Sequence, residues 1–158
     1  MIFDKFFNKA YDSEVLARIK FLSGIALFKG IKRKDLLYIL ESIYEKKYLK
    51  GESLFIEGDI GRALFIVYSG RIGLYKRNTS ENILFSEVGT GDFIGEMALL
   101  EEMPRTLSAI AIEESIVFML YKTNIESMNH TKPKIASQIN YNLAKILSSR
   151  LRGVIEGK

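Results

Sequence analysis

The feature that most constrains this chain is a block of short apolar segments between positions 53 and 121, separated by turn residues. The segments are rich in Ile, Leu, Phe, Val and Tyr, and Gly, Asp, Asn or Ser stand between them, as is typical of β-strands. Their regular spacing indicates an antiparallel sandwich or small barrel. Within it, Ser69-Gly70 predicts a tight hairpin and Asn78–Asn82 a longer hairpin loop. The predicted strands are Ser53–Ile56, Ala63–Tyr68, Arg71–Lys76, Ile83–Val88, Leu107–Ile112 and Ile116–Tyr121.

Apolar residues recur at helical spacing on both sides of this block. Residues 1–45 are predicted to be helical with a break at Gly30, and residues 123–157 to be helical with Pro133 near a helix start. We therefore expect a single domain over residues 1–158, in which helices flank a β-block at 46–121. The fold class is mainly β with flanking helices.

Composition excludes several kinds of site. The chain has no cysteine and one histidine, His130, which excludes disulfides, thiolate metal sites, cysteine nucleophiles and sites built on several imidazoles. No apolar run is longer than the six residues Ala63–Tyr68, so we expect no membrane span, no signal peptide and a cytoplasmic protein. The net charge of +4 fits an anionic partner only weakly, and no DNA-binding motif is present.

One stretch interrupts the strand pattern. Glu96–Glu102 contains strong helix formers and no β-branched residue, and Pro104 ends it, which predicts a helix of about two turns. Gly95 allows close approach to the N–H groups at the helix start, where anions bind. Arg105 carries a planar cation suited to a phosphate, and Glu96 offers an acceptor for a sugar hydroxyl. Together these groups point to a sugar phosphate.

Each of these residues also has an explanation that needs no ligand. A glutamate in the first turn of a helix, such as Glu96, interacts favourably with the helix dipole. An arginine that begins a strand is usually exposed or paired with a carboxylate, and Glu101 and Glu102 lie close to Arg105 in the sequence.

The run Gly91–Leu100, followed by Pro104-Arg105-Thr106, resembles the phosphate-binding cassette of cyclic nucleotide-binding domains. Gly58-Asp59 and Leu64–Ile72 resemble early strands and turns of the same family, and the similarity extends from about Phe21 to the C-terminus. The resemblance implies an eight-stranded antiparallel β-roll with N-terminal helices, a short cassette helix and a C-terminal lid helix. It also implies cAMP as the ligand, with cGMP as the alternative, and no cofactor, metal or catalytic residue.

The resemblance assigns the phosphate and ribose contacts to the cassette. Glu96 would accept the ribose 2′-hydroxyl, and Arg105 would pair with the cyclic phosphate. Backbone N–H groups near Met97 and Ala98 would complete the phosphate site. Gly95 would let the backbone lie against the ribose.

The base would meet other residues. In the family, a hydroxyl at the position of Thr106 contacts the phosphate or the guanine of cGMP, and it does not exclude cAMP. The last helix closes over the purine, which would bring Leu147 and Arg150 to the base. From the residues alone, Arg150 falls inside the apolar arc of the helix, and it either faces the base or reaches water or a carboxylate.

The apolar residues of the predicted helix 135–155 span an arc of about 160° on a helical wheel. An arc of this width can pack on the β-roll and also on a second copy of the helix, so we expect a homodimer through this helix. A broad arc on a terminal helix also occurs in monomers.

We therefore expect a cyclic-nucleotide sensor, not an enzyme, that signals through the C-terminal helix to a separate effector protein. The chain starts at Met1 and stops at Lys158 without a helix-turn-helix, so we expect a stand-alone module without a DNA-binding domain, with a fragment of a larger protein as the alternative. The alternative is a ligand-free β-roll that serves as an interaction or dimerisation scaffold. An enzyme on a cupin-like barrel fits poorly, because His130 lies outside the predicted strands and no nucleophile–base pair is visible.

Overall fold

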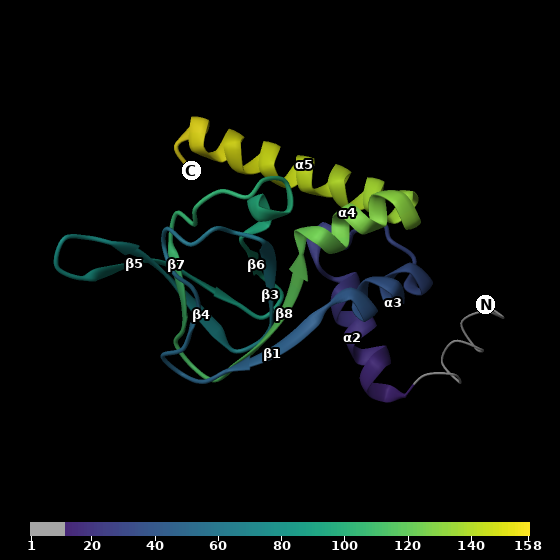
Figure 1. Cartoon of the computed structure of the whole chain (residues 1–158), viewed down its shortest axis with the longest axis horizontal. Coiled ribbons are helices and arrows are strands. Elements are labelled where there is room, and N and C mark those ends of the chain that lie inside the picture. The colour runs from purple at the N-terminus through teal and green to yellow at the C-terminus, as the bar shows by residue number, and fades with distance from the viewer. Residues whose placement is uncertain (1–11) are drawn as a thin grey trace. The chain divides into compact units, whose positions relative to one another are not determined.

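The computed structural model describes residues 12–158, and its strands form two four-stranded antiparallel sheets (Figure 1). The strand order is β1-β8-β3-β6 in one sheet and β2-β7-β4-β5 in the other. The predicted mainly β fold with eight antiparallel strands is therefore confirmed. The strands are β1 (Tyr44–Tyr48), β2 (Ser53–Phe55), β3 (Ala63–Ser69), β4 (Arg71–Arg77), β5 (Asn82–Gly89), β6 (Phe93–Ile94), β7 (Ser108–Ala111) and β8 (Ser115–Tyr121).

The chain divides into two compact units, each of which is described by itself. The β unit, Ser42–Thr131, contains both sheets and helix α4 (Lys122–Thr131). The helical unit consists of the described residues up to Glu41 together with Lys132–Lys158. The core of the β unit draws on both sheets, because apolar side chains on facing strands point inward. Its buried members are Tyr48, Ala63, Phe65, Val67, Ile72, Ile94, Ala109, Ala111 and Val117.

The predicted hairpin at Ser69-Gly70 is wrong. β3 and β4 belong to different sheets, so this turn is a corner at which the chain changes sheets. Gly70 has a φ of 91°, and a side chain there would overlap the hydroxyl of Ser115 at the start of β8. The sequence shows the sharp turn but not the pairing, because both a hairpin and a corner need a residue with positive φ. The longer loop at 78–82 does join paired strands, β4 and β5, as predicted.

Two strands were not among those predicted from the apolar pattern. Residues 44 and 45 were predicted to be helical, but Tyr44–Tyr48 forms β1, which pairs along its length with β8. Four of its five residues are exposed, so the apolar alternation that marks a half-buried strand is absent. β6 has only two residues, which is too short to show any period.

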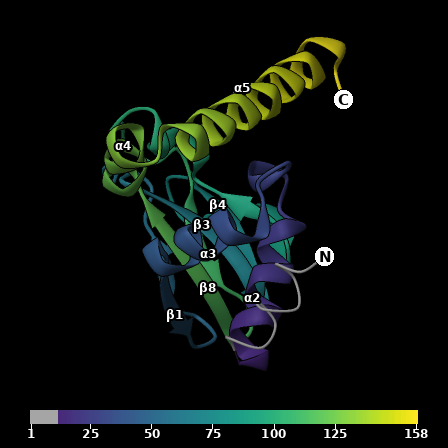
Figure 2. The ribbon, with the colours of Figure 1, turned by 90° about the vertical axis from the view of Figure 1, so that its right-hand side faces the viewer.

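The helical unit contains α2 (Ser13–Ser23), the 3₁₀ helix η1 (Ala26–Phe28), α3 (Arg33–Ser42) and α5 (Pro133–Glu156), although Ser42 itself falls in the β unit. Asp12 caps α2 by accepting from the Val15 N–H. Pro133 stands in the first turn of α5, which confirms its predicted place near a helix start. Figure 2 shows α5 as one continuous helix. The predicted helix over residues 1–11 lies outside the described residues. Among the helices described, none is both long and apolar enough to cross a bilayer.

The buried Asn142 amide joins α5 to η1. It donates hydrogen bonds to the carbonyl oxygens of Leu27 (2.9 Å) and Lys29 (2.8 Å), and accepts one from Gln138 (3.1 Å). Satisfying these groups matters because a buried polar atom without a partner is costly. Asn142 was not identified from the sequence, because its contacts with Leu27 and Lys29 join segments more than 110 residues apart.

Candidate ligand-binding site

The cassette begins with a left-handed turn at Gly95, whose φ is 76°. The helix that follows, η2 (Glu96–Leu99), is a single 3₁₀ turn, so the predicted two-turn helix over 96–102 is wrong. Strong helix formers do not suffice here, because starting a helix is unfavourable unless packing compensates. Leu100 and Met103 lie on the surface, 53% and 58% exposed, so a second turn has no apolar face to bury.

η2 holds a buried carboxylate and an exposed methionine side by side. Glu96 is only 5% exposed, whereas the next side chain, Met97, is 58% exposed. The Ala98 N–H donates to the Gly95 carbonyl oxygen at 3.1 Å, while the Met97 N–H has no acceptor among residues 12–158. Of the two N–H groups expected to bind phosphate, only that of Met97 is therefore available without breaking a bond within the turn.

The backbone of Arg105 is fixed on both sides by the turn that follows β2. Its N–H donates to the Asp59 carbonyl oxygen at 2.7 Å, and its own carbonyl oxygen accepts from the Gly58 N–H at 2.9 Å. The guanidinium then reaches back to the start of β3, where Nη2 donates to the Ala63 carbonyl oxygen at 2.7 Å. A longer contact of 3.5 Å runs from Nη1 to the Gly95 carbonyl oxygen. Arg105 thus ties the cassette to β3.

Two glycines leave room for this guanidinium. A Cβ atom on Gly61 would lie 3.0 Å from Cζ of Arg105 and 3.1 Å from Cβ of Ala98. A Cβ on Gly95 would overlap Nη1 of Arg105 and lie 3.3 Å from the Ala63 oxygen. The structure therefore gives a reason for glycine at position 95 that does not depend on a ribose.

Arg105 forms no ion pair with a carboxylate in the described part of the chain, and its side-chain acceptors there are the carbonyl oxygens of Ala63 and Gly95. Glu102 instead faces Arg62, with 3.6 Å between oxygen and nitrogen. Burial lowers the pKa of the half-buried Arg105 guanidinium, and the negative charge of Asp59 opposes this only in part. A desolvated cation whose protein acceptors are neutral carbonyls is suited to an anionic ligand.

Thr106 directly follows Arg105 in the chain. Its side chain is exposed, and its hydroxyl has no hydrogen-bond partner among the residues described. Its carbonyl oxygen accepts from Lys76 Nζ at 3.0 Å, and Lys76 also pairs with Glu57 at 2.7 Å. The hydroxyl therefore stays available for a ligand, while the backbone beside it is held by β4.

Leu147 and Arg150 lie on α5, in the helical unit. Leu147 is half-buried, and Arg150 is exposed although it falls inside the apolar arc, which agrees with the alternative that its side chain reaches water. The contact of these two residues with a base stays a prediction. The apolar arc is buried only in the first half of α5. Two of its later members, Leu151 and Val154, are exposed, and so is Ile155, which lies outside the arc.

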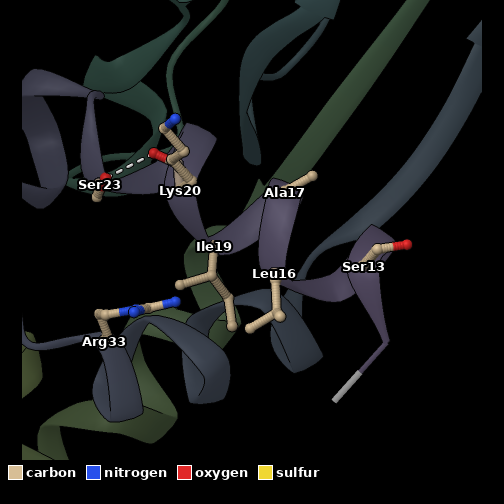
Figure 3. Close-up of a pocket in the computed structure, with 7 residues that line it drawn as sticks. All are labelled: Ser13, Leu16, Ala17, Ile19, Lys20, Ser23 and Arg33. Carbon is tan, nitrogen blue, oxygen red and sulfur yellow. Dashed lines mark hydrogen bonds between the residues drawn. The ribbon is translucent and has the colours of Figure 1, made fainter. Parts of the chain in front are cut away.

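A pocket of about 610 Å³ lies in the helical unit, between α2 and the start of α3 (Figure 3). It combines an apolar floor with two cations and two hydroxyls, and no cassette residue lines it. Its lining residues are Ser13, Leu16, Ala17, Ile19, Lys20, Ser23 and Arg33. Within residues 12–158, no group of three or more His, Asp or Glu side chains is arranged to hold a metal ion.

Sequence reasoning missed the residues that surround the Arg105 side chain. Phe55, on β2, lies beneath it, with 4.3 Å between the ring centroid and Cζ, and Phe65, on β3, lies 5.5 Å away. Gly61 and the Ala63 carbonyl oxygen complete its surroundings. One local signal was present: 54–56 is an unbroken apolar run, and an ordinary half-buried strand alternates instead.

The chain is similar to known proteins in sequence and in fold. Residues 45–131 match the sequence profile of the family described as "Cyclic nucleotide-binding domain". The Cyclic AMP receptor protein of Thermus thermophilus is 30% identical over 132 residues, which cover 83% of this chain and 59% of that protein. A cAMP-dependent protein kinase regulatory subunit of Neurospora crassa is 29% identical over 108 residues, covering 68% of this chain and 28% of that one.

A solved structure shows the same architecture. The crystal structure of Thermus thermophilus Catabolite Activator Protein aligns with a TM-score of 0.74 at 28% identity, covering 84% of this chain and 61% of that chain. The chain spans 58–59% of the length of its bacterial receptor and regulator relatives. Because the profile match covers more than half of the chain, and carries the cassette with it, this chain belongs to the cyclic nucleotide-binding domain family.

Proposed function

We propose that this chain is a cyclic-nucleotide sensor that binds cAMP, with cGMP as a second ligand. The observation that carries the proposal is the environment of Arg105, a half-buried cation whose acceptors are the neutral carbonyls of Ala63 and Gly95. A cyclic phosphate supplies the missing negative charge. The buried carboxylate of Glu96 and the available Met97 N–H flank the same turn and suit a ribose and a phosphate oxygen. The printed names of two relatives, a cyclic AMP receptor and a cAMP-dependent kinase subunit, support cAMP.

The remainder of the proposal concerns how the bound ligand is signalled to other proteins. We propose that binding is the whole activity of the cassette and that no bond is made or broken there. The C-terminal helix would act as the lid, with Leu147 and Arg150 toward the base, and would carry the signal to a separate effector protein. Its exposed residues Leu151, Val154 and Ile155 suit a second copy of the helix, which is the homodimer predicted from the sequence.

Calorimetric titration tests the ligand. Wild-type protein is titrated with cAMP, cGMP and 5′-AMP, and Arg105→Ala is compared with Arg62→Ala, which removes an exposed arginine outside the cassette turn. Losing the charged partner of a buried anion costs about 2–5 kcal/mol, so Arg105→Ala should weaken cAMP binding by about 30- to several-thousandfold. Arg62→Ala should bind as wild type does.

Two outcomes would count against the proposal. Equal cAMP affinity for Arg105→Ala and wild type would remove Arg105 from the site. A folded wild-type protein that binds none of the three nucleotides would favour the ligand-free scaffold.

A further inference from the structure

The short strand β2 contains a bulge that places Phe55 on the inner face of the roll. Ser53 pairs with Ile110 on β7, but Phe55, two residues later, pairs with Ala109, only one residue back. Successive side chains on a regular strand point to opposite faces, yet Leu54 and Phe55 both pack against the core. An extra residue in one strand re-aims the side chains beside it, and here the aromatic ring turns toward Arg105.

Phe55 does not act alone. Its ring lies 5.2 Å from that of Phe65, centroid to centroid, with the planes tilted by 47°. Phe65 is on the central strand β3 and is only 4% exposed, so Phe55 packs against a buried ring. Cζ of Arg105 lies 4.3 Å from the nearer ring and 5.5 Å from the farther one, both within cation–π range.

The remaining walls restrict the guanidinium further. Gly61 and Gly95 approach it so closely that a Cβ atom on either would collide with it or crowd it. The Ala63 carbonyl oxygen takes one N–H at 2.7 Å. The guanidinium therefore lies in a slot, defined here as Phe55, Phe65, Gly61, Gly95 and the Ala63 carbonyl. An arginine has five N–H donors, and this slot uses no more than two of them.

We propose that Phe55 is a positioning residue for the phosphate contact: its ring fixes the plane of the Arg105 guanidinium so that the unused N–H donors face the incoming anion. This inference rests on the proposed cyclic-nucleotide site and names the group that orients its main cation. A side chain ordered before the ligand arrives loses less conformational freedom on binding, so the ring contributes affinity without touching the ligand.

Substitutions at Phe55 test the role of the ring. Phe55→Leu and Phe55→Met keep an apolar side chain and remove the aromatic face, whereas Phe55→Tyr keeps the face. We expect the first two to weaken cAMP binding by about tenfold and Phe55→Tyr to stay within about threefold of wild type. Tyr68→Leu is the matched control, because it removes a half-buried ring that stacks on Phe118 at 4.6 Å in the same unit. It should lower the melting temperature and leave cAMP affinity unchanged.

A double-mutant cycle separates positioning from general damage. If Phe55 acts through Arg105, then Phe55→Leu should weaken cAMP binding by less than about twofold in an Arg105→Ala background. A loss of about tenfold in both backgrounds would overturn the proposal, because the ring would then act independently of the arginine. Failure of Phe55→Tyr to bind better than Phe55→Leu would overturn it as well.

A measurement without ligand keeps this inference separate from the proposed function. The Nε–H signal of Arg105, assigned by its loss in Arg105→Lys, should carry a ring-current shift in the NMR spectrum of the free protein. The shift should disappear in Phe55→Leu and persist in Phe55→Tyr. If wild type binds no cyclic nucleotide, the proposed function fails, and this signal still decides whether Phe55 holds the guanidinium. An unchanged shift in Phe55→Leu would show that it does not.

Discussion

Among single residues, Glu96 offers the most direct test of ribose recognition. A hydrogen bond to a carboxylate is worth about 1.5–3 kcal/mol, so a nucleotide without the 2′-hydroxyl should bind wild type at least about tenfold more weakly. We predict that 2′-deoxy-cAMP loses this factor against wild type and that Glu96→Gln reduces the difference, because a neutral amide is a weaker acceptor. Competition binding measures both ratios. Equal affinities of the two nucleotides for wild type would exclude Glu96 from the ribose site.

How much of the site was predictable depends on how far apart its parts lie in the sequence. Gly95, Glu96 and Arg105 fall within one short stretch, and the chemistry of that stretch points to a sugar phosphate from residue types alone. The surroundings of the arginine come from elsewhere: Phe55 and Gly61 precede it by tens of residues. No local pattern predicts their contact with Arg105, because it depends on how β2 and the turn before β3 meet the cassette.

Among the elements, the turn after β2 is joined to β4 by hydrogen bonds to the Glu57 carboxylate, and the stability that these bonds contribute depends on pH. Glu57 accepts from Lys76 Nζ at 2.7 Å and from the Arg77 N–H at 2.8 Å. The Lys76 hydrogen bond is the main reason that the pKa of Glu57 lies below its ordinary value. A group whose pKa is lower in the folded state stabilises that state above its unfolded pKa, and the contribution is lost as the pH falls through the folded value.

We therefore predict a pH-dependent effect of Glu57→Gln. Near neutral pH the variant should have a lower free energy of unfolding than wild type. The difference should shrink as the pH falls below about 4.3, the ordinary glutamate value, because wild-type Glu57 then also becomes neutral. Urea titrations between neutral pH and about pH 3.5 measure it. Glu101→Gln, which removes a carboxylate that has no ion pair in the described structure, is the control. A difference that stays constant with pH would contradict the assignment.

A second prediction at this scale concerns the contact of α5 with η1. Asn142→Leu removes an amide that serves two buried carbonyls, and an unsatisfied buried group costs about 1–3 kcal/mol. The free energy of unfolding should fall by about that amount. Asn140→Leu is the matched control, since Asn140 is half-buried on the same helix and its side chain forms no hydrogen bond with any described residue. Equal losses for both variants would show that the amide contacts do not matter.

The elements that sequence reasoning found are those that carry an apolar period. All six strands predicted in the 53–121 block exist, to within a residue at either end. β1 was missed because its outward face is charged and its partner, β8, lies about 70 residues later. The length of η2 was overestimated because helix propensity depends on residue type and not on the burial that a second turn requires. The corner at Gly70 shows that a turn residue predicts a change in the direction of the chain but not which strands pair.

For the whole molecule, the proposed ligand site and α5 belong to different units, so a signal from the ligand must pass from the β unit to α5. The residues from Leu147 to Lys158 include no buried side chain, so removing them should leave the β unit folded. If this part of α5 is the lid, a chain ending at Ile146 should bind cAMP about 10- to 100-fold more weakly, in line with typical coupling energies. A chain ending at Glu156 is the control.

Hydrogen exchange gives the second readout of the same prediction. Addition of cAMP should protect amides at 95–106 and also at 135–155. Protection confined to the cassette, together with unchanged affinity of the chain ending at Ile146, would show that α5 is not the lid.

The Asn142 contact also has a mechanical consequence. α5 is held on η1 near Leu143, its last buried residue, and continues to Glu156, about 20 Å farther at about 1.5 Å per residue. A rotation of about 10° around the held end carries the tip through about 3.5 Å, slightly more than the length of one hydrogen bond. α5 is therefore held by the Asn142 amide and by its buried residues up to Leu143, while its last turns are exposed. A displacement too small to break a contact at η1 would be larger at the exposed end, where it could exchange one set of contacts for another.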